Sequence, residues 1–193
     1  MGHYFTNDNN LKENIQKVNV SVDNINYYFY TDNGVFSKGE LDYGTELLLK
    51  TFEYDLNKTK ALDIGCGCGP IGLYLSKIGF DVDMTDVNLR AIELSKRALD
   101  EQELKANIFE SDAYTNINGK YDYIVSNPPI RVGKEKLYEI LMNAKDYLKE
   151  NGEFWIVVRK KQGADSVVKD MKLVYNNVQV VQKKKGFCII KAD

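Results

Sequence analysis

The sequence predicts an α/β fold built on a mostly parallel β-sheet with helices on both faces. From residue 60 onward, short segments that are hydrophobic throughout alternate with segments whose apolar residues have helical spacing. Strands of this kind are typical of parallel sheets that helices cover on both sides. In addition, the glycine-dense segment 65–69 directly follows the first of these strands, where parallel sheets bind their ligands.

The chain before residue 60 has a different pattern. Residues 7–14 are polar, so we expect a mobile N-terminal segment over residues 1–14. Residues 15–36 are rich in Val, Ile, Tyr and Phe, and Asp23-Asn24 interrupts them, which predicts a β-hairpin. Because 193 residues are typical of one domain, we expect residues 15–193 to form a single domain that includes this hairpin.

Each element of the alternating region is predicted from the spacing of its apolar residues. A spacing of i, i+3, i+4 and i+7 predicts a helix, and a short apolar run predicts a strand. The strands are expected at residues 61–64, 80–85, 106–110, 121–126 and 154–158, the helices at 71–78, 88–99, 137–148 and 164–171, and a closing hairpin at 173–181 and 186–191. Asn88 is the expected N-cap of the second helix, and Asn151-Gly152 is expected to stop the third.

The composition argues against some classes of protein. The net charge of −2 and the isoelectric point near 5.6 disfavour a general nucleic-acid-binding protein, which is usually basic. Three clusters of Lys and Arg are nevertheless present, and we expect most of them to be solvated faces, with phosphate contacts as the alternative. They are Arg131/Lys134/Lys136, Arg159/Lys160/Lys161 and Lys183/Lys184/Lys185.

Cysteine and histidine usage limits the chemistry further. Three cysteines form no disulfide framework and indicate a reducing compartment, so we expect a cytoplasmic protein. Cys66 and Cys68 supply too few ligands for zinc, and His3 is the only histidine, so we expect neither a metal site nor a Ser-His-Asp mechanism. No apolar run approaches eighteen residues, so no membrane span is expected.

The glycine-dense segment is the first candidate binding site. Its sequence is Asp63-Ile64-Gly65-Cys66-Gly67-Cys68-Gly69-Pro70, and its glycines allow close approach of the backbone to a ligand. A P-loop needs Gly-Lys-Ser/Thr, which is missing, and the dinucleotide fingerprint needs glycine where this chain has Pro70. A glycine-rich turn without a ligand is the alternative.

Polar residues also end the next two predicted strands. Asp86 is followed by Val87-Asn88, and a carboxylate at this place can accept both ribose hydroxyls of an adenosine. Capping of the next helix is the alternative role for Asp86. Ser111-Asp112-Ala113 follows the third strand in the same manner.

The segment Asn127-Pro128-Pro129 offers hydrogen-bond acceptors at the end of the fourth strand. It contains two of the three prolines of the chain, which favour a rigid turn and have no N–H. The Asn127 carboxamide oxygen and the Pro128 carbonyl can hold both N–H groups of a planar amine and orient its nitrogen for methyl transfer. Asn127 and Pro128 are therefore the candidate catalytic residues.

Together these motifs resemble the class I methyltransferases that use S-adenosylmethionine. The resemblance implies a Rossmann-like, mostly parallel seven-stranded sheet with an antiparallel C-terminal hairpin, to which the N-terminal hairpin is added. It also implies glycines beside the methionine part of the cofactor and Asp112 beside its adenine. The cofactor-binding residues expected on this basis are Asp63, Gly65, Cys66, Gly67, Gly69, Asp86, Val87, Asn88, Asp112, Ala113, Asn127, Phe36 and Thr45.

Two segments are similar to the small-subunit ribosomal RNA guanine-N2 methyltransferases (the RsmC type), namely residues 34–48 and 127–134. This resemblance implies ribosomal RNA or a ribosomal subunit as the partner, with Pro129, Ile130 and Arg131 contacting the substrate. The fourth position of the Asn-Pro-Pro motif is usually aromatic in that family, whereas Ile130 cannot stack on a base. The candidates for a replacement ring are Tyr4, Phe5, Phe36 and Tyr43.

Other functions stay open at this point. Methylation of a glutamine side chain in a protein would use the same acceptors, and the acidic isoelectric point fits a protein substrate. A non-catalytic RNA-binding or assembly factor would keep the fold, although Asp63, Asp86 and Asn127 are intact. A NAD-type dehydrogenase is disfavoured by Pro70.

Overall fold

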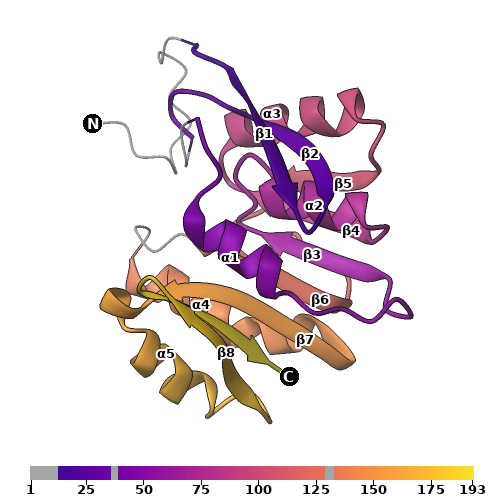
Figure 1. The fold of residues 1–193 in the computed structure, drawn as a ribbon. Helices are drawn as coiled ribbons and strands as arrows, with labels where there is room; N and C mark the ends of the chain where they lie inside the picture. The colour runs from indigo at the N-terminus through magenta and orange to yellow at the C-terminus, as the bar shows by residue number, and fades with distance from the viewer. Residues whose placement is uncertain (1–12, 36–38, 129–132) are drawn as a thin grey trace.

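The computed structural model describes residues 13–35, 39–128 and 133–193, and its centre is a seven-stranded sheet (Figure 1). In the order β5-β4-β3-β6-β7-β9-β8, the first five strands are parallel and β9 runs antiparallel to both neighbours. This arrangement confirms the predicted fold class. The strands are β3 (Lys60–Ile64), β4 (Asp81–Asp86), β5 (Ala106–Glu110), β6 (Tyr121–Ser126), β7 (Leu148–Arg159), β8 (Val178–Lys184) and β9 (Phe187–Ala192).

The strand order reverses between β3 and β6. From β3 the chain adds β4 and β5 on one side, and it then returns to add β6 and β7 on the other. The loops after β3 and β6 therefore diverge and leave a crevice, which is where open α/β sheets bind ligands. The glycine loop 65–69 and Asn127-Pro128 follow these two strands.

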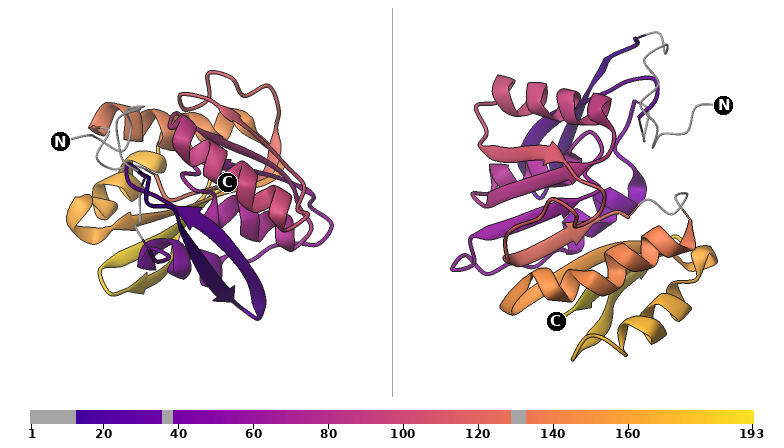
Figure 2. Two further views of the ribbon diagram at one scale, coloured as in Figure 1. Left: turned by 90° about the horizontal axis from the view of Figure 1, so that it is seen from above. Right: turned by 180° about the vertical axis from the view of Figure 1, so that it is seen from behind.

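Helices cover both faces of the sheet (Figure 2). One apolar cluster lies on each side. The first three helices pack on one face and the last two on the other. Successive residues of a strand point to opposite faces, so the fully buried neighbours Phe154 and Trp155 enter different clusters. Within the described ranges, no helix has the length and apolar content needed to cross a membrane. The helices are α1 (Tyr43–Thr51), α2 (Pro70–Lys77), α3 (Leu89–Glu101), α4 (Lys134–Asn143) and α5 (Ala164–Met171), with short 3-10 turns η2 (Ala144–Tyr147) and η3 (Lys160–Gln162).

The N-terminal hairpin packs against α2 and α3 (Figure 1). Its strands β1 (Gln16–Val22) and β2 (Ile25–Thr31) are joined by Asp23-Asn24, whose φ angles of 49° and 66° are positive, as a type I′ turn requires. After α3, the Gln102 side chain exchanges two hydrogen bonds with the backbone of Tyr28, at 3.0 and 2.8 Å. The predicted hairpin is therefore fixed to the helical layer.

An ion pair fixes the end of β2. Asp32 is only 2% exposed, and its carboxylate accepts a hydrogen bond from Nε of Arg90 in α3 at 2.7 Å. Burial alone would raise the pKa of Asp32, but hydrogen bonds from Asn14 and Arg90 hold this pKa below its ordinary value. The pair holds β2 where its Phe29 reaches the cavity described below.

Two element boundaries differ from the predicted ones. Asn151-Gly152, expected to end a helix, lies inside β7, which begins at Leu148 opposite Tyr121. A Cβ on Gly152 would be 2.8 Å from the Tyr121 carbonyl oxygen, so glycine is needed here for close packing of two backbones at a register shift. The strand β8 begins at Val178 instead of residue 173, and it includes Lys183 and Lys184, which were expected in the turn of the hairpin.

Candidate active site

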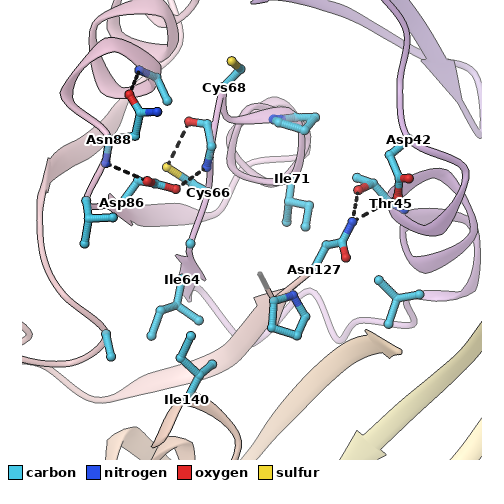
Figure 3. Close-up of a pocket in the computed structure, with 18 of the residues that line it drawn as sticks. Asp42, Thr45, Ile64, Cys66, Cys68, Ile71, Asp86, Asn88, Asn127 and Ile140 are labelled. Atoms are coloured by element: carbon cyan, nitrogen blue, oxygen red, sulfur yellow. Dashed lines mark hydrogen bonds between the residues drawn. The ribbon is translucent and has the colours of Figure 1, made fainter. Parts of the chain in front are cut away.

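A cavity of about 350 Å³ opens at the carboxyl ends of the parallel strands (Figure 3). Its volume is in the range of sites for cofactors and other small molecules. Most of the residues around it come from the loops after β3, β4, β5 and β6, and from α1 and the ends of β7 and β9. Of the residues predicted for the cofactor, those that line it are Thr45, Gly65, Cys66, Gly67, Asp86, Val87, Asn88, Asp112, Ala113 and Asn127.

Hydrogen bonds join the glycine loop to Asp86. The backbone N–H groups of Gly67 and Asn88 each donate to the Asp86 carboxylate, both at 2.8 Å. Burial raises the pKa of Asp86, and these two bonds oppose the rise. The carboxylate therefore has a fixed orientation in the cavity wall, and its other lone pairs can accept hydrogen bonds from a ligand.

Asp63, at the end of β3, and Gly69, the last residue of the glycine loop, do not line the cavity. One carboxylate oxygen of the fully buried Asp63 accepts from the N–H of Gly72 in α2 at 2.8 Å, and the other has no partner among the described residues. Burial raises the pKa of Asp63 to about 8. A Cβ on Gly69 would be 2.6 Å from the Cε of Met84. Asp63 and Gly69 therefore hold the loop in place against α2 and β4.

The ends of β4 and β5 shape the next part of the wall. Asn88 caps α3, since its side-chain oxygen accepts from the N–H of Ala91 at 3.1 Å, as the sequence predicts. The side chain of Asp112 is 60% exposed and pairs with Nζ of Lys136 in α4 at 2.9 Å. A carboxylate accepts several hydrogen bonds, so this ion pair leaves acceptor capacity for a ligand amine.

The side chain of Asn127 lies on the opposite side of the cavity from Asp86 and Asn88 (Figure 3). Its Nδ2 donates to Oδ2 of Asp42 at 3.1 Å and to Oγ1 of Thr45 at 2.9 Å. An ionised carboxylate is only an acceptor, so the nitrogen of the amide must face Asp42. The carboxamide oxygen of Asn127 is therefore on the other side of the amide, where it accepts no hydrogen bond from any residue that the structure describes.

The cysteines of the glycine loop are thiols. All three cysteines of the chain are free and buried. Burial raises the pKa of Cys66 well above its ordinary value, and the nearby carboxyl of Asp63 adds to this shift, so the thiol stays protonated. Among residues whose positions the structure describes, no three His, Cys, Asp or Glu side chains are grouped as metal ligands.

The sequence and fold were compared with those of known proteins. The profile of the methyltransferase small-domain family matches residues 26–191. The chain belongs to this family. S-Adenosylmethionine is the cofactor of these methyltransferases, as the motifs of the chain predict.

Individual relatives of this methyltransferase domain differ in length. The protein of Bacillus subtilis named "Uncharacterized protein YbxB" is 40% identical over 195 residues, covering 98% of this chain and 97% of the relative. Ribosomal RNA small subunit methyltransferase C of Haemophilus influenzae is 41% identical over 138 residues, which are 68% of this chain. The matched region is 42% of that relative, so the domain spans less than half of the RNA methyltransferases it matches.

A solved structure has the same fold. The T. thermophilus 16S rRNA N2 G1207 methyltransferase (RsmC), solved with AdoMet and guanosine, superposes with a TM-score of 0.83 at 23% identity. The superposition covers 93% of this chain and 50% of the other chain. At this level of identity, the likeness confirms the class I methyltransferase fold.

The cavity has the volume and the hydrogen-bond acceptors that a cofactor such as S-adenosylmethionine needs. Gly67 lines it with a φ of +54°, and a Cβ there would meet no protein atom within 4 Å, so any side chain would project into open space. The Asp86 carboxylate can accept the ribose hydroxyls. The glycine loop and Asp86 are thus the residues expected to hold the methionine part and the ribose.

Several predicted residues lie outside the described ranges. These are Phe36 of the cofactor set, the substrate residues Pro129, Ile130 and Arg131, and the candidate rings Tyr4 and Phe5. The remaining candidate ring, Tyr43, does not line the cavity but contacts Phe187, with 5.6 Å between ring centroids.

The cavity lining also includes residues that were not among the predicted site residues, and Asp42, Phe187 and Arg159 are three of these. Asp42 orients Asn127 and also caps α1, accepting from the N–H of Thr45 at 3.1 Å. The helix-capping position of Asp42, three residues before Thr45, was a signal in the sequence. Phe187 and Arg159 line the cavity from β9 and the end of β7. Their positions depend on the register of these strands, which the sequence pattern does not specify.

Proposed function

We propose that this methyltransferase transfers a methyl group from S-adenosylmethionine to the exocyclic N2 amine of guanine in small-subunit ribosomal RNA. When bound, the cofactor supplies an electrophilic methyl group on a sulfonium. The relatives named as ribosomal RNA methyltransferases support an RNA substrate. The reaction is expected in the cytoplasm, which agrees with three free thiols.

The orientation of the Asn127 amide is the observation that carries this proposal. Its nitrogen is held by Asp42 and Thr45, so its oxygen is fixed as an acceptor before any substrate enters. The next residue, Pro128, lines the same wall, and its carbonyl is the second acceptor in this proposal. Preorganised acceptors cost little reorganisation when charge develops on the reacting nitrogen.

The chemistry needs acceptors and no nucleophilic side chain. The Asn127 oxygen and the Pro128 carbonyl accept the two N–H groups of the amine and orient its lone pair. That pair forms the new N–C bond while the S–C bond breaks and its electrons return to sulfur. The positive charge that builds on nitrogen strengthens both hydrogen bonds, and one N–H proton then leaves to water.

The test uses purified protein with S-adenosylmethionine carrying a labelled methyl group. Unmodified small ribosomal subunits and naked ribosomal RNA are incubated separately, and the nucleosides are then resolved by mass spectrometry. We expect labelled N2-methylguanosine with the wild type, and a loss of about 10²- to 10³-fold in turnover for Asn127→Ala, as for removal of a preorganised polar group. Cofactor affinity, measured by calorimetry, should change little.

Other outcomes of the same experiment would exclude the proposal. Label in glutamine residues of ribosomal proteins and none in RNA would assign a protein substrate. Absence of label from all fractions, together with no bound cofactor in native mass spectra, would indicate a non-catalytic factor. Loss of cofactor binding in Asn127→Ala would show that the role given to Asn127 is wrong.

A further inference from the structure

Two basic clusters that are separate in the sequence form one surface. The backbone N–H of Lys160, in η3, donates to the carbonyl of Gly186, in the β8–β9 turn, at 2.8 Å. This bond brings the segment 159–161 against the segment 183–185. We call the six side chains the basic surface: Arg159, Lys160, Lys161, Lys183, Lys184 and Lys185.

The cations of this surface are available for a partner. All six residues are exposed, and within the part of the chain that the structure describes none of them is in an ion pair. In contrast, Lys191 of the same hairpin pairs with Glu153 at 2.9 Å. A group of cations without counter-charges, in a chain of net charge −2, is typical of a surface that binds a polyanion.

The basic surface leads directly into the cavity. Phe187 is paired with Arg159 on β7 and with Lys184 on β8, and residues directly opposite in antiparallel strands point to the same face. Phe187 and Arg159 both line the cavity, and the Arg159 guanidinium lies 4.8 Å from the centre of the Phe187 ring. One row of side chains, formed by Lys184, Phe187 and Arg159, therefore crosses the three strands and reaches the cavity wall.

This row combines the two contacts that single-stranded RNA needs. Lysines bind phosphates, and both aromatic rings and arginine guanidinium planes stack on bases. Gly44 makes room for the ring, since a Cβ there would be 2.8 Å from Cε1 of Phe187. The N2 amine of guanine is occupied in a Watson–Crick pair, so an acceptor guanine must be unpaired to enter a cavity of this kind.

We propose that the basic surface binds the phosphates of the single-stranded RNA that carries the acceptor guanine, and that Arg159 and Phe187 form a stacking surface for a base at the cavity entrance. The inference rests on the proposed function, because it names the RNA path to that site. It also supplies the ring that Ile130 cannot provide.

The experiment compares two triple variants with the same change in net charge. Lys161→Glu/Lys183→Glu/Lys184→Glu reverses three cations of the basic surface whose side chains form no hydrogen bond or ion pair with the residues that the structure describes. The control, Lys77→Glu/Lys105→Glu/Lys120→Glu, reverses three exposed lysines that precede β4, β5 and β6, at the amino ends of the parallel strands and away from the cavity at their carboxyl ends. Fluorescein-labelled single-stranded RNA of mixed sequence is the probe, and anisotropy is measured at several salt concentrations.

We expect the Kd for this RNA to rise at least about tenfold in the surface variant at low salt. The slope of the logarithm of the association constant against the logarithm of the salt concentration should become less steep by about 2, at roughly 0.7 per lost phosphate contact. The control should stay within about twofold of the wild type, since its cations are outside the path. Equal effects of both variants would overturn the proposal, because only net charge would then matter. Loss of binding to poly-glutamate without loss of RNA binding would overturn it in favour of an acidic protein partner.

A second measurement tests the stacking surface. RNA containing 2-aminopurine loses fluorescence when this base stacks on an aromatic ring. Quenching should occur with the wild type and with Phe187→Tyr, and should be lost with Phe187→Leu; equal quenching in all three would remove Phe187 from the path. Neither measurement needs methyl transfer, so each can succeed or fail independently of the proposed activity. Calorimetry with S-adenosylmethionine on every variant checks that the cavity stays intact.

Discussion

An oxygen of the Asp42 carboxylate accepts a hydrogen bond from the Asn127 side chain at 3.1 Å, although the two residues are 85 positions apart. The same oxygen accepts the N–H of Thr45 and so caps α1. One carboxylate therefore joins the first turn of a helix to the end of β6. The position of α1 is in this way linked to the orientation of the proposed catalytic amide.

Replacing Asp42 should lower turnover without weakening cofactor binding. In Asp42→Ser the hydroxyl still caps α1 but is too short to reach Asn127, so the amide loses one of its two fixed partners. We expect kcat to fall by about tenfold, equivalent to ~1.4 kcal/mol of transition-state stabilisation. Asp42→Asn keeps an acceptor oxygen of the same length and is the matched control. Equal kcat values for Ser and Asn variants would contradict the positioning role.

The two glycines Gly67 and Gly69 should respond differently to a methyl group. Both have positive φ angles, +54° and +79°, so alanine strains the backbone at either position. At Gly69 the added Cβ would also be 2.6 Å from Met84, so Gly69→Ala should mainly lower the melting temperature. At Gly67 the Cβ meets only open space, so Gly67→Ala should mainly raise the Kd for S-adenosylmethionine. Thermal melts and calorimetry on both variants would show the contrast, and a shared pattern would refute it.

Asp86 is expected to determine cofactor affinity. Asp86→Ala removes the acceptors proposed for the ribose hydroxyls and the partner of the Gly67 N–H. Hydrogen bonds to a charged group contribute about 1.5–3 kcal/mol each, so the Kd should rise at least about tenfold. Asp83→Ala, on the same strand but outside the cavity wall, is the control and should leave the Kd unchanged. An unaltered Kd in Asp86→Ala would take Asp86 out of the cofactor site.

Asp63 should make the protein less stable as pH rises. Burial raises its pKa from 3.8 to about 8, so between these values the folded protein keeps a proton that the unfolded chain releases. Unfolding then releases a proton, and the free energy of unfolding falls by up to about 1.4 kcal/mol per pH unit through this window. Below pH 3.8 and above pH 8 the group contributes no slope, because both states carry the same charge.

The corresponding measurement is urea denaturation of the wild type and Asp63→Asn at pH 5, 6.5 and 8. The asparagine does not titrate, so the wild type should lose stability relative to the variant as pH increases. Asp86, whose pKa is also raised by burial, is present in both proteins and cancels in the comparison. Parallel stability curves would show that Asp63 is ionised in the folded protein.

The sequence was sufficient to predict the elements whose signals are local. The cap at Asn88 and the turn at Asp23-Asn24 depend on neighbouring residues only, and both occur as expected. The end of the helix before β7 was placed wrongly, because Asn151-Gly152 resembles a helix stop. Its glycine instead allows β7 to pack against the backbone of Tyr121, a contact between distant segments.

The same distinction holds for the candidate site. The glycine loop, Asp86 and Asn127 follow strand ends, and parallel strands bring their carboxyl ends to one edge, so their convergence could be predicted. The contribution of Phe187 could not, because it follows from the pairing of β9 with β7. Sequence spacing gives no information on which strand of a terminal hairpin is the inner one.

The free edge of β8 has a consequence for self-association. An outer strand presents unpaired N–H and C=O groups, which can recruit the edge of another molecule. Here the register shift between Val180 and Gln182 interrupts the regular spacing of those groups, and Lys183 and Lys184 place like charges where two such edges would meet. The lysines proposed to bind RNA thus also oppose edge-to-edge pairing of β8 with the same strand of another molecule, and apolar residues at these positions would remove that protection.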